Sequence, residues 1–196
     1  MVTRLWKLMK PSLAGLLGAP GLYEVVNYKA ILELKDTDGH KAVYTKMERV
    51  RFLTDNVSTI YDYSWSDGQS FANHSVYPGR IIDRQSIGSR YKTMIALPTP
   101  KNKGDYLTLR VRRLVRDGLA DKQCWLEAEV CHRTELMTLM VVLPRERSVN
   151  KAYLMAQQSQ TVVPVRVTID REGRQKLRHV VRSPKVGDRY TLQWHW

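Results

Sequence analysis

Apolar and polar residues alternate with a period of two in segment after segment of this chain. In the run 21–36, Tyr28 and Leu32 share one face while Asn27 and Lys29 take the other. Successive side chains of an extended strand point to opposite faces, so this pattern indicates half-buried β-strands and not amphipathic helices. The sequence therefore predicts an all-β protein.

Turn-forming residues separate the alternating segments and fix where the strands end. Asp38-Gly39 follows the first run and predicts a tight hairpin, because such turns need positive φ. About eleven strands are expected, at 21–36, 41–53, 57–65, 90–98, 106–116, 123–133, 136–144, 151–157, 161–170, 175–181 and 189–196. Pro164 predicts an edge or bulge within its segment, since proline cannot donate a ladder hydrogen bond.

These strands predict an antiparallel β-sandwich or flattened barrel. The first three are expected to form a meander, and the irregular stretch 66–88 is expected to be a long functional or mobile connection. Two regions are predicted, with 1–21 as a basic amphipathic lead-in containing a short helix and 22–196 as a single all-β domain. The final strand should be paired and buried, because its Tyr190, Leu192 and Trp194 share one face.

Charge and cysteine usage narrow the compartment and the partners. Cys124 and Cys131 lie seven residues apart on one expected strand and thus on opposite faces, so we predict no disulfide and a cytoplasmic location. No apolar stretch is long enough for a transmembrane helix, although residues 1–17 could contact a membrane surface. The formal net charge of +13 favours anionic partners, among them nucleic acid.

Two expected strands carry basic residues at even spacing. Arginine guanidinium groups match phosphate geometry, so both rows are candidate polyanion-binding faces. The candidates are Arg110, Arg112 and Arg116 on one strand and Arg174, Lys176, Arg178 and Arg182 on the other. The alternative is a solvated outer face whose charges protect the sheet against aggregation.

A third candidate surface is aromatic. Tyr61, Tyr63 and Trp65 share one face of the segment 57–65, opposite Asp62, and Asp67 and His74 follow in the irregular connection. Such a row would suit a ligand pocket or a partner surface, but ordinary core packing of the aromatic rings is the favoured interpretation. The sequence contains no HExxH, CxxC, GxSxG or glycine-rich phosphate loop, so we expect no enzyme activity, no metal and no cofactor.

The stretches "GLYEVVNYKAILELKD", "KMERVRFL", "DYSWSDG" and "VGDRYTLQWHW" resemble all-β accessory domains of bacterial signalling and conflict (defence) proteins. The resemblance implies an accessory role beside an effector or sensor module and carries no catalytic residues. The leading hypothesis is a non-enzymatic accessory module that engages a protein partner or a larger assembly. Polyanion binding through the basic strand faces and small-ligand sensing in an aromatic-lined pocket remain alternatives.

Overall fold

The computed structural model describes residues 21–65, 73–87, 90–116, 119, 123–149, 151–158 and 160–195. Fourteen strands and no helix occur in this part of the chain, and the strands form three open sheets. The prediction of an all-β sandwich is confirmed. The expected helix within residues 1–21 lies outside the described residues.

The largest sheet has seven strands in the order β12-β13-β9-β1-β2-β7-β4. These strands are β12 (Arg166–Ile169), β13 (Gln175–Arg182), β9 (Thr134–Val142), β1 (Tyr23–Leu34), β2 (Lys41–Phe52), β7 (Tyr106–Arg116) and β4 (Ser75–Tyr77). β1 and β9 pair in parallel, whereas the other pairings in this sheet are antiparallel. The sheet is therefore mixed and not purely antiparallel as expected.

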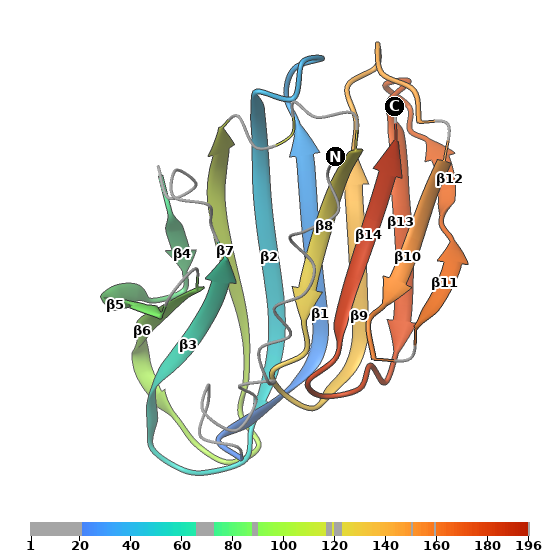
Figure 1. Ribbon diagram of the computed structural model, residues 1–196. Coiled ribbons are helices and arrows are strands. Elements are labelled where there is room, and N and C mark those ends of the chain that lie inside the picture. Colours follow the sequence, from blue (N-terminus) through green and yellow to red (C-terminus); the bar gives the residue numbers. More distant parts are fainter. Residues whose placement is uncertain are drawn as a thin grey trace.

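Two smaller sheets cover one face of the large one (Figure 1). A four-stranded sheet has the order β11-β10-β14-β8, and a three-stranded sheet has the order β3-β6-β5. The strands are β11 (Thr161–Pro164), β10 (Lys151–Ala156), β14 (Arg189–His195), β8 (Gln123–Glu129), β3 (Val57–Trp65), β6 (Arg90–Lys101) and β5 (Arg80–Ile87). The opposite, outer face of the seven-stranded sheet carries neither of these sheets.

The core lies between the layers and includes the last strand of the chain. β14 is a central strand of the four-stranded sheet, between β10 and β8, and its Leu192 and Trp194 are fully buried. Tyr190 is 7% exposed on the same face. The prediction of a paired and buried final strand is confirmed, because these large apolar side chains gain most by leaving water.

One segment of the chain belongs to both outer edges of the sandwich. β11 ends the four-stranded sheet at Pro164, and after Val165 the chain enters β12 at the edge of the seven-stranded sheet. Strands that change sheets in this way form the corners of sandwiches. The prediction that Pro164 marks an edge is confirmed.

Several details differ from the sequence-based expectations. The structure has fourteen strands where eleven were expected, because β4 and β5 form within the stretch 66–88 and because 161–170 divides at the corner. The three-strand meander is wrong, since β3 pairs with β6 and not with β2. Cys124 and Cys131 are unbridged as predicted, although Cys131 lies beyond the end of β8.

Candidate functional site

The outer face of the seven-stranded sheet brings the two predicted basic strands onto one surface. On β7, Leu109 and Val111 are buried against the core, whereas Arg110, Arg112 and Arg116 are exposed on the opposite face. On β13, Leu177 is buried and the residues on either side of it point to the same outer face. The strand register aligns one row of this face as Arg112, Thr45, Ile31, Met140 and Arg178.

The arginines form two borders of this face. β7 and β13 are separated by three intervening strands, so the two borders lie about 19 Å apart at a typical strand spacing. Within the described residues, none of the ion pairs that the structure contains involves the exposed border arginines. These are Arg110, Arg112, Arg116, Arg178 and Arg182.

Between the borders the face carries several apolar side chains. Met47, Ile31, Leu136, Met140 and Val180 are half-buried there, on the side of the sheet away from the core. The surface thus has apolar side chains, with Lys29 and Arg49 among them, between guanidinium groups at its sides. We call it the arginine-bordered face.

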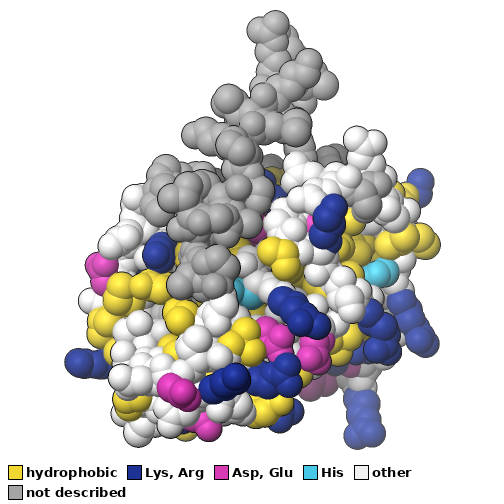
Figure 2. All heavy atoms as spheres, turned by 90° about the horizontal axis from the view of Figure 1, so that it is seen from below, with side chains coloured by type: hydrophobic (Ala, Val, Ile, Leu, Met, Phe, Trp, Pro, Cys, Tyr) yellow, Lys and Arg dark blue, Asp and Glu magenta, His cyan; other side chains and the backbone are white. Residues whose placement is uncertain are grey.

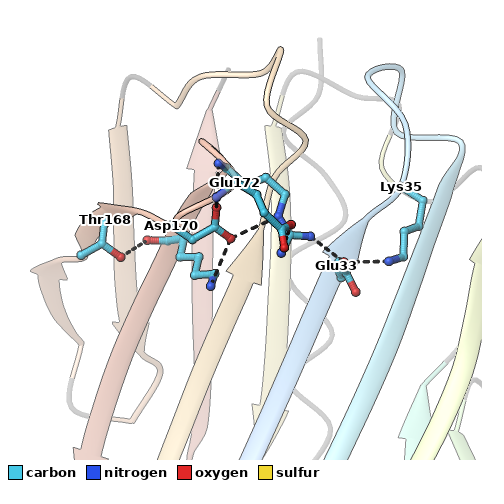
Figure 3. A network of polar contacts seen from close by, with 7 residues as sticks. Glu33, Lys35, Thr168, Asp170 and Glu172 are labelled. Carbon is cyan, nitrogen blue, oxygen red and sulfur yellow. Dashed lines mark hydrogen bonds and ion pairs between the residues drawn. The ribbon is translucent and has the colours of Figure 1, made fainter.

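Two of the predicted polyanion-binding residues are already paired with carboxylates. Arg174 contacts Glu33 at 2.9 Å, Asp170 at 3.1 Å and Glu172 at 2.9 Å, and Lys176 contacts Asp170 at 3.1 Å (Figure 3). Although desolvation opposes its ionisation, hydrogen bonds from the amides of Arg174 and Glu172 and from Lys176 lower the pKa of Asp170 to about 2. This network holds the β12–β13 hairpin against β1, so these two residues are left out of the arginine-bordered face.

Charged side chains of both signs are visible on the molecule when it is seen from below. Figure 2 shows Lys and Arg side chains projecting around the margin of the described molecule, with Asp and Glu side chains between some of them near the centre of the view.

The aromatic candidates lie on β3, but they do not form the inner face of that strand. Tyr61 and Tyr63 are half-buried, with ring centroids 6.4 Å apart, and the ammonium of Lys92 lies 4.0 Å from the Tyr61 ring centroid. Asp62 is the fully buried residue between them. The expectation that the rings pack into the core is therefore wrong for these two tyrosines. Asp67 and the side chain of Trp65 lie outside the described residues.

A buried charge cluster forms around Asp62 where the three-stranded sheet meets the seven-stranded sheet. The Asp62 carboxylate contacts the ammonium of Lys46 at 2.6 Å and pairs with the guanidinium of Arg113. Lys46 also contacts Glu48 at 3.1 Å. Burial alone would raise the pKa of Asp62, but Lys46 and Arg113 lower it, so the carboxylate stays ionised.

His74 reaches the same cluster, although it precedes β4. Its side chain is only 2% exposed, with Nε2 3.9 Å from an Asp62 oxygen and Nδ1 2.6 Å from an Arg84 nitrogen. Because a guanidinium only donates, Nδ1 accepts and the ring proton is on Nε2. Burial and the nearby Arg113 lower the pKa of His74 to about 4, so the ring is neutral at pH 7.

His132 is a second neutral histidine, and it is half-buried. Its ring lies 4.4 Å from the ring of Tyr23, and burial together with Lys46 lowers its pKa to about 4. Among the described residues, no group of three or more His, Cys, Asp or Glu side chains could hold a metal ion.

These histidines make stability depend on pH in a defined direction. An unfolded chain protonates histidine near pH 6.5, whereas the folded protein does so only near pH 4, so acid favours the unfolded state between those values. We expect each histidine to remove up to about 3 kcal/mol of unfolding free energy between pH 7 and pH 4. The raised pKa of Glu48, which follows from its burial, opposes this loss in part.

Urea unfolding at stepped pH measures this effect. Stability should fall steadily as the pH drops from 7 to 4, and His132→Phe, which keeps a ring beside Tyr23, should make the fall shallower. If the unfolding free energy does not change over this pH range, or if His132→Phe leaves its pH dependence unchanged, the histidines are not held neutral in the folded protein.

A shallow hollow lies on a different sheet from the aromatic candidates. It has a volume of about 280 Å³ and opens on the outer face of the four-stranded sheet. Its lining includes Glu127, Met155, Val162, Arg189 and Thr191. This hollow is therefore not the aromatic-lined pocket that was hypothesised beside Tyr61 and Tyr63.

Sequence reasoning missed Lys46 and Arg113 as members of a buried cluster. A signal was present, because Arg113 occupies an inward position of β7 between Val111 and Val115. A charged residue in the apolar half of a period-two pattern predicts a buried partner of opposite charge. The identity of that partner depends on the contact between two sheets.

Comparisons with known proteins show the fold and no family. No protein-family model matches the sequence, and no curated protein is significantly similar to it. An M1 zinc metallopeptidase from Deinococcus radiodurans matches 90% of this chain with a TM-score of 0.51 and 16% identity. A putative protease from Parabacteroides distasonis matches 91% with a TM-score of 0.57 and 11% identity.

The chain spans less than half the length of these solved structures, 43% of the first and 41% of the second. A fold similar to this one thus occurs within longer chains. At such low identity the similarity concerns the fold alone, and the resemblance to accessory domains of signalling and defence proteins stays a prediction. No helix in the described part of the chain has the length and apolar character needed to cross a membrane.

Proposed function

We propose that this chain is a non-enzymatic binding module that engages a protein partner or a larger assembly through the arginine-bordered face. The observation that carries the proposal is the register row from Arg112 through Ile31 and Met140 to Arg178, which joins an apolar centre to two cationic sides. Protein interfaces have this composition, since Met and Arg are enriched in them. The partner surface would be apolar at its centre and acidic at its sides.

The fold comparison supports an accessory role. Similar folds account for 41–43% of the solved protease chains, so the fold is compatible with a place beside other domains. A module that works in this way needs a face that its own layers do not cover, and the outer face of the seven-stranded sheet meets that condition in the described residues.

Charge reversal at both borders tests the proposal. In the double variant Arg112→Glu/Arg178→Glu the acidic sides of the partner meet carboxylates, and we expect partner binding to weaken about 10- to 100-fold. Both side chains are exposed, so the fold should be retained. Quantitative pull-down from the native host, followed by titration of the recovered partner, measures the change.

The matched control is Arg80→Glu/Lys185→Glu, which makes the same change in net charge at exposed positions on other elements. It should bind the partner within about threefold of the unchanged protein, because its charges lie outside the interface and act only through the screened field. If both double variants lose partner affinity to the same extent, the loss is an effect of net charge alone. The arginine-bordered face would then not be the partner-binding site.

Nucleic acid is the second candidate, favoured by the five border arginines that have no ion pair within the described residues. It predicts that log K falls with log[salt] by about 0.7 to 0.9 per phosphate neutralised. Oligonucleotides that bind tightly with this slope, and whose binding Arg112→Glu/Arg178→Glu removes, would make the face a nucleic-acid interface. The apolar centre favours protein, since phosphates gain nothing from Met and Ile side chains.

A further inference from the structure

The corner segment Thr161–Ile169 gives the sandwich a continuous open edge. β11 pairs only with β10, and β12 pairs only with β13, so each is the terminal strand of its sheet among the described residues. Three of the exposed large apolar residues lie on this one segment, with Val162 at 57%, Val167 at 41% and Ile169 at 70% exposure. An edge strand presents unpaired backbone N–H and C=O groups, to which an additional strand can bond.

The backbone of β12 presents hydrogen-bonding groups toward this open side. The amide of Asp170 donates to the carbonyl of Arg174, so the pairs 170–174, 168–176 and 166–178 are the hydrogen-bonded pairs of the hairpin. Alternation then directs the N–H and C=O groups of Val167 and Ile169 away from β13. These are the groups that a further strand would bind.

The side chains of the same two residues point between the sheets. Val167 lies opposite the fully buried Leu177, and Val165, two residues earlier on the same face, is 8% exposed. Burial therefore decreases along this face from Val165 to Ile169, because no further strand among the described residues covers the apolar side chains at the edge. A neighbouring strand would have to bring apolar side chains to this side.

The outer side of the edge is cationic. Arg166 lies directly opposite Arg178, and both are exposed. Like charges in this position repel each other. The nearest carboxylates in the hairpin, on Asp170 and Glu172, contact Arg174 and Lys176 instead. Added strand residues on this side would therefore be stabilised by negative charge.

We propose that β12 accepts an extended acidic segment of a partner protein as an additional strand, with carboxylates facing Arg166 and β-branched residues covering Val167 and Ile169. This is recognition by strand addition, in which main-chain hydrogen bonds supply affinity and alternate side chains supply specificity. The net charge of +13 opposes a second copy of this chain at the same edge. The inference rests on the proposed function, because it names how part of the protein partner is bound.

The probe for this proposal is a fluorescently labelled, end-capped peptide of four Glu-Val repeats. Its binding to the protein is measured by fluorescence anisotropy at low ionic strength. The peptide should bind the full chain, and the matching Lys-Val peptide should bind at least about tenfold more weakly, because it places cations opposite Arg166. Absence of binding by the acidic peptide, or equal binding of the two peptides, overturns the proposal.

Proline at position 167 tests the backbone contact. The Val167 amide does not bond to β13, so Val167→Pro removes an outward donor while leaving the hairpin ladder intact. We expect peptide binding to fall at least about tenfold with the melting temperature nearly unchanged, and Val167→Thr, which keeps the amide, to bind within about threefold. Equal affinities of the two variants contradict strand addition.

Backbone methylation of the peptide gives a test that does not depend on any variant folding. In an added strand, one alternate set of amides faces β12 and the other faces solvent. Methylation of the amides that face β12 should abolish peptide binding, and methylation of the other set should preserve it. If both methylated peptides bind, or if neither binds, the proposal is wrong. A chain that dimerises on its own and becomes monomeric with Val167→Pro would show that a second copy occupies the edge.

The two proposals fail separately. Val167→Pro leaves the border arginines in place, whereas Arg110→Glu/Arg112→Glu on β7 leaves both the β12 amides and the cationic pair Arg166 and Arg178 in place. If Val167→Pro retains the whole partner and the peptide does not bind, strand addition is wrong and the arginine-bordered face stands. If charge reversal at the face leaves the partner bound while Val167→Pro releases it, the edge is the interface and the face is not.

Discussion

Replacing Asp62 by Asn is expected to lower the free energy of unfolding by about 3–5 kcal/mol, which is the loss typical of breaking a buried ion pair from one side. The substitution keeps the shape of the side chain but leaves Lys46 and Arg113 buried beside a neutral amide. Because typical domains have a stability of about 5–15 kcal/mol, this variant should be close to unfolding at 37 °C. Urea denaturation followed by tryptophan fluorescence measures the change.

Asp83→Asn is the matched control, since Asp83 is exposed and bonds to its own neighbours in β5. It should change stability by less than about 0.5 kcal/mol. The double variant Asp62→Asn/Arg113→Gln should be less destabilised than the sum of its two single variants, because removing the second charge relieves the first defect. If the losses of unfolding free energy in the two single variants simply add in the double variant, Asp62 and Arg113 act independently. That result would contradict the ion pair between them.

Trp194→Ala is expected to lower the unfolding free energy by about 3–5 kcal/mol, through lost burial and the cavity that remains. Trp194 has no exposed surface and lies opposite Cys124 of β8, on the core side of the four-stranded sheet. The effect should appear as a lower urea midpoint with an unchanged slope, since the same surface is still exposed on unfolding.

Trp125→Ala provides the control on the adjacent strand. Trp125 pairs with Gln193 on the outer face of the same sheet and is 56% exposed, so its truncation should reduce stability by less than about 1 kcal/mol. Comparable losses for the two tryptophans would contradict the orientation of β14, because a shift of one residue in register would exchange the two faces of a strand.

The strands could be predicted because period-two patterning is a local property. The runs that became β1, β2 and β3 begin and end within about two residues of their predicted limits, and Gly39 takes a positive φ at the predicted hairpin. Local irregularities were not predicted. The register between β1 and β2 shifts at Val25–Asn27, so that Val25 is buried although it is an odd number of residues from Tyr28, which is also buried.

The arrangement of the sheets could not be predicted, because it depends on contacts between distant segments. The parallel pairing of β1 with β9 joins residues 25–33 to residues 134–142 and places both arginine rows on one face. No local pattern specifies that pairing. The exposure of Arg110, Arg112, Arg178 and Arg182 followed from alternation, but their presence on one surface followed only from the strand order.

The burial of charged residues was the second feature that the sequence did not predict. Alternation placed Asp62 opposite Tyr61 and Tyr63, and the usual preference for burying aromatic rings then favoured the wrong face as the inner one. The structure reverses this preference because Lys46 and Arg113 arrive from two strands of another sheet and compensate the carboxylate. A compensated buried charge is a property of the assembled layers, and the strand that carries Asp62 gives no sign of its partners.

Site-specific photo-cross-linking from the centre of the arginine-bordered face tests the central claim most directly. With a photoreactive residue in place of Ile31, we predict a discrete protein adduct in the native host that is absent when Arg112→Glu/Arg178→Glu is added. The same group in place of Ser58, an exposed residue of β3, should give no such adduct. An adduct that nuclease removes, an identical adduct from both positions, or none from position 31 would contradict the claim that this face binds a protein.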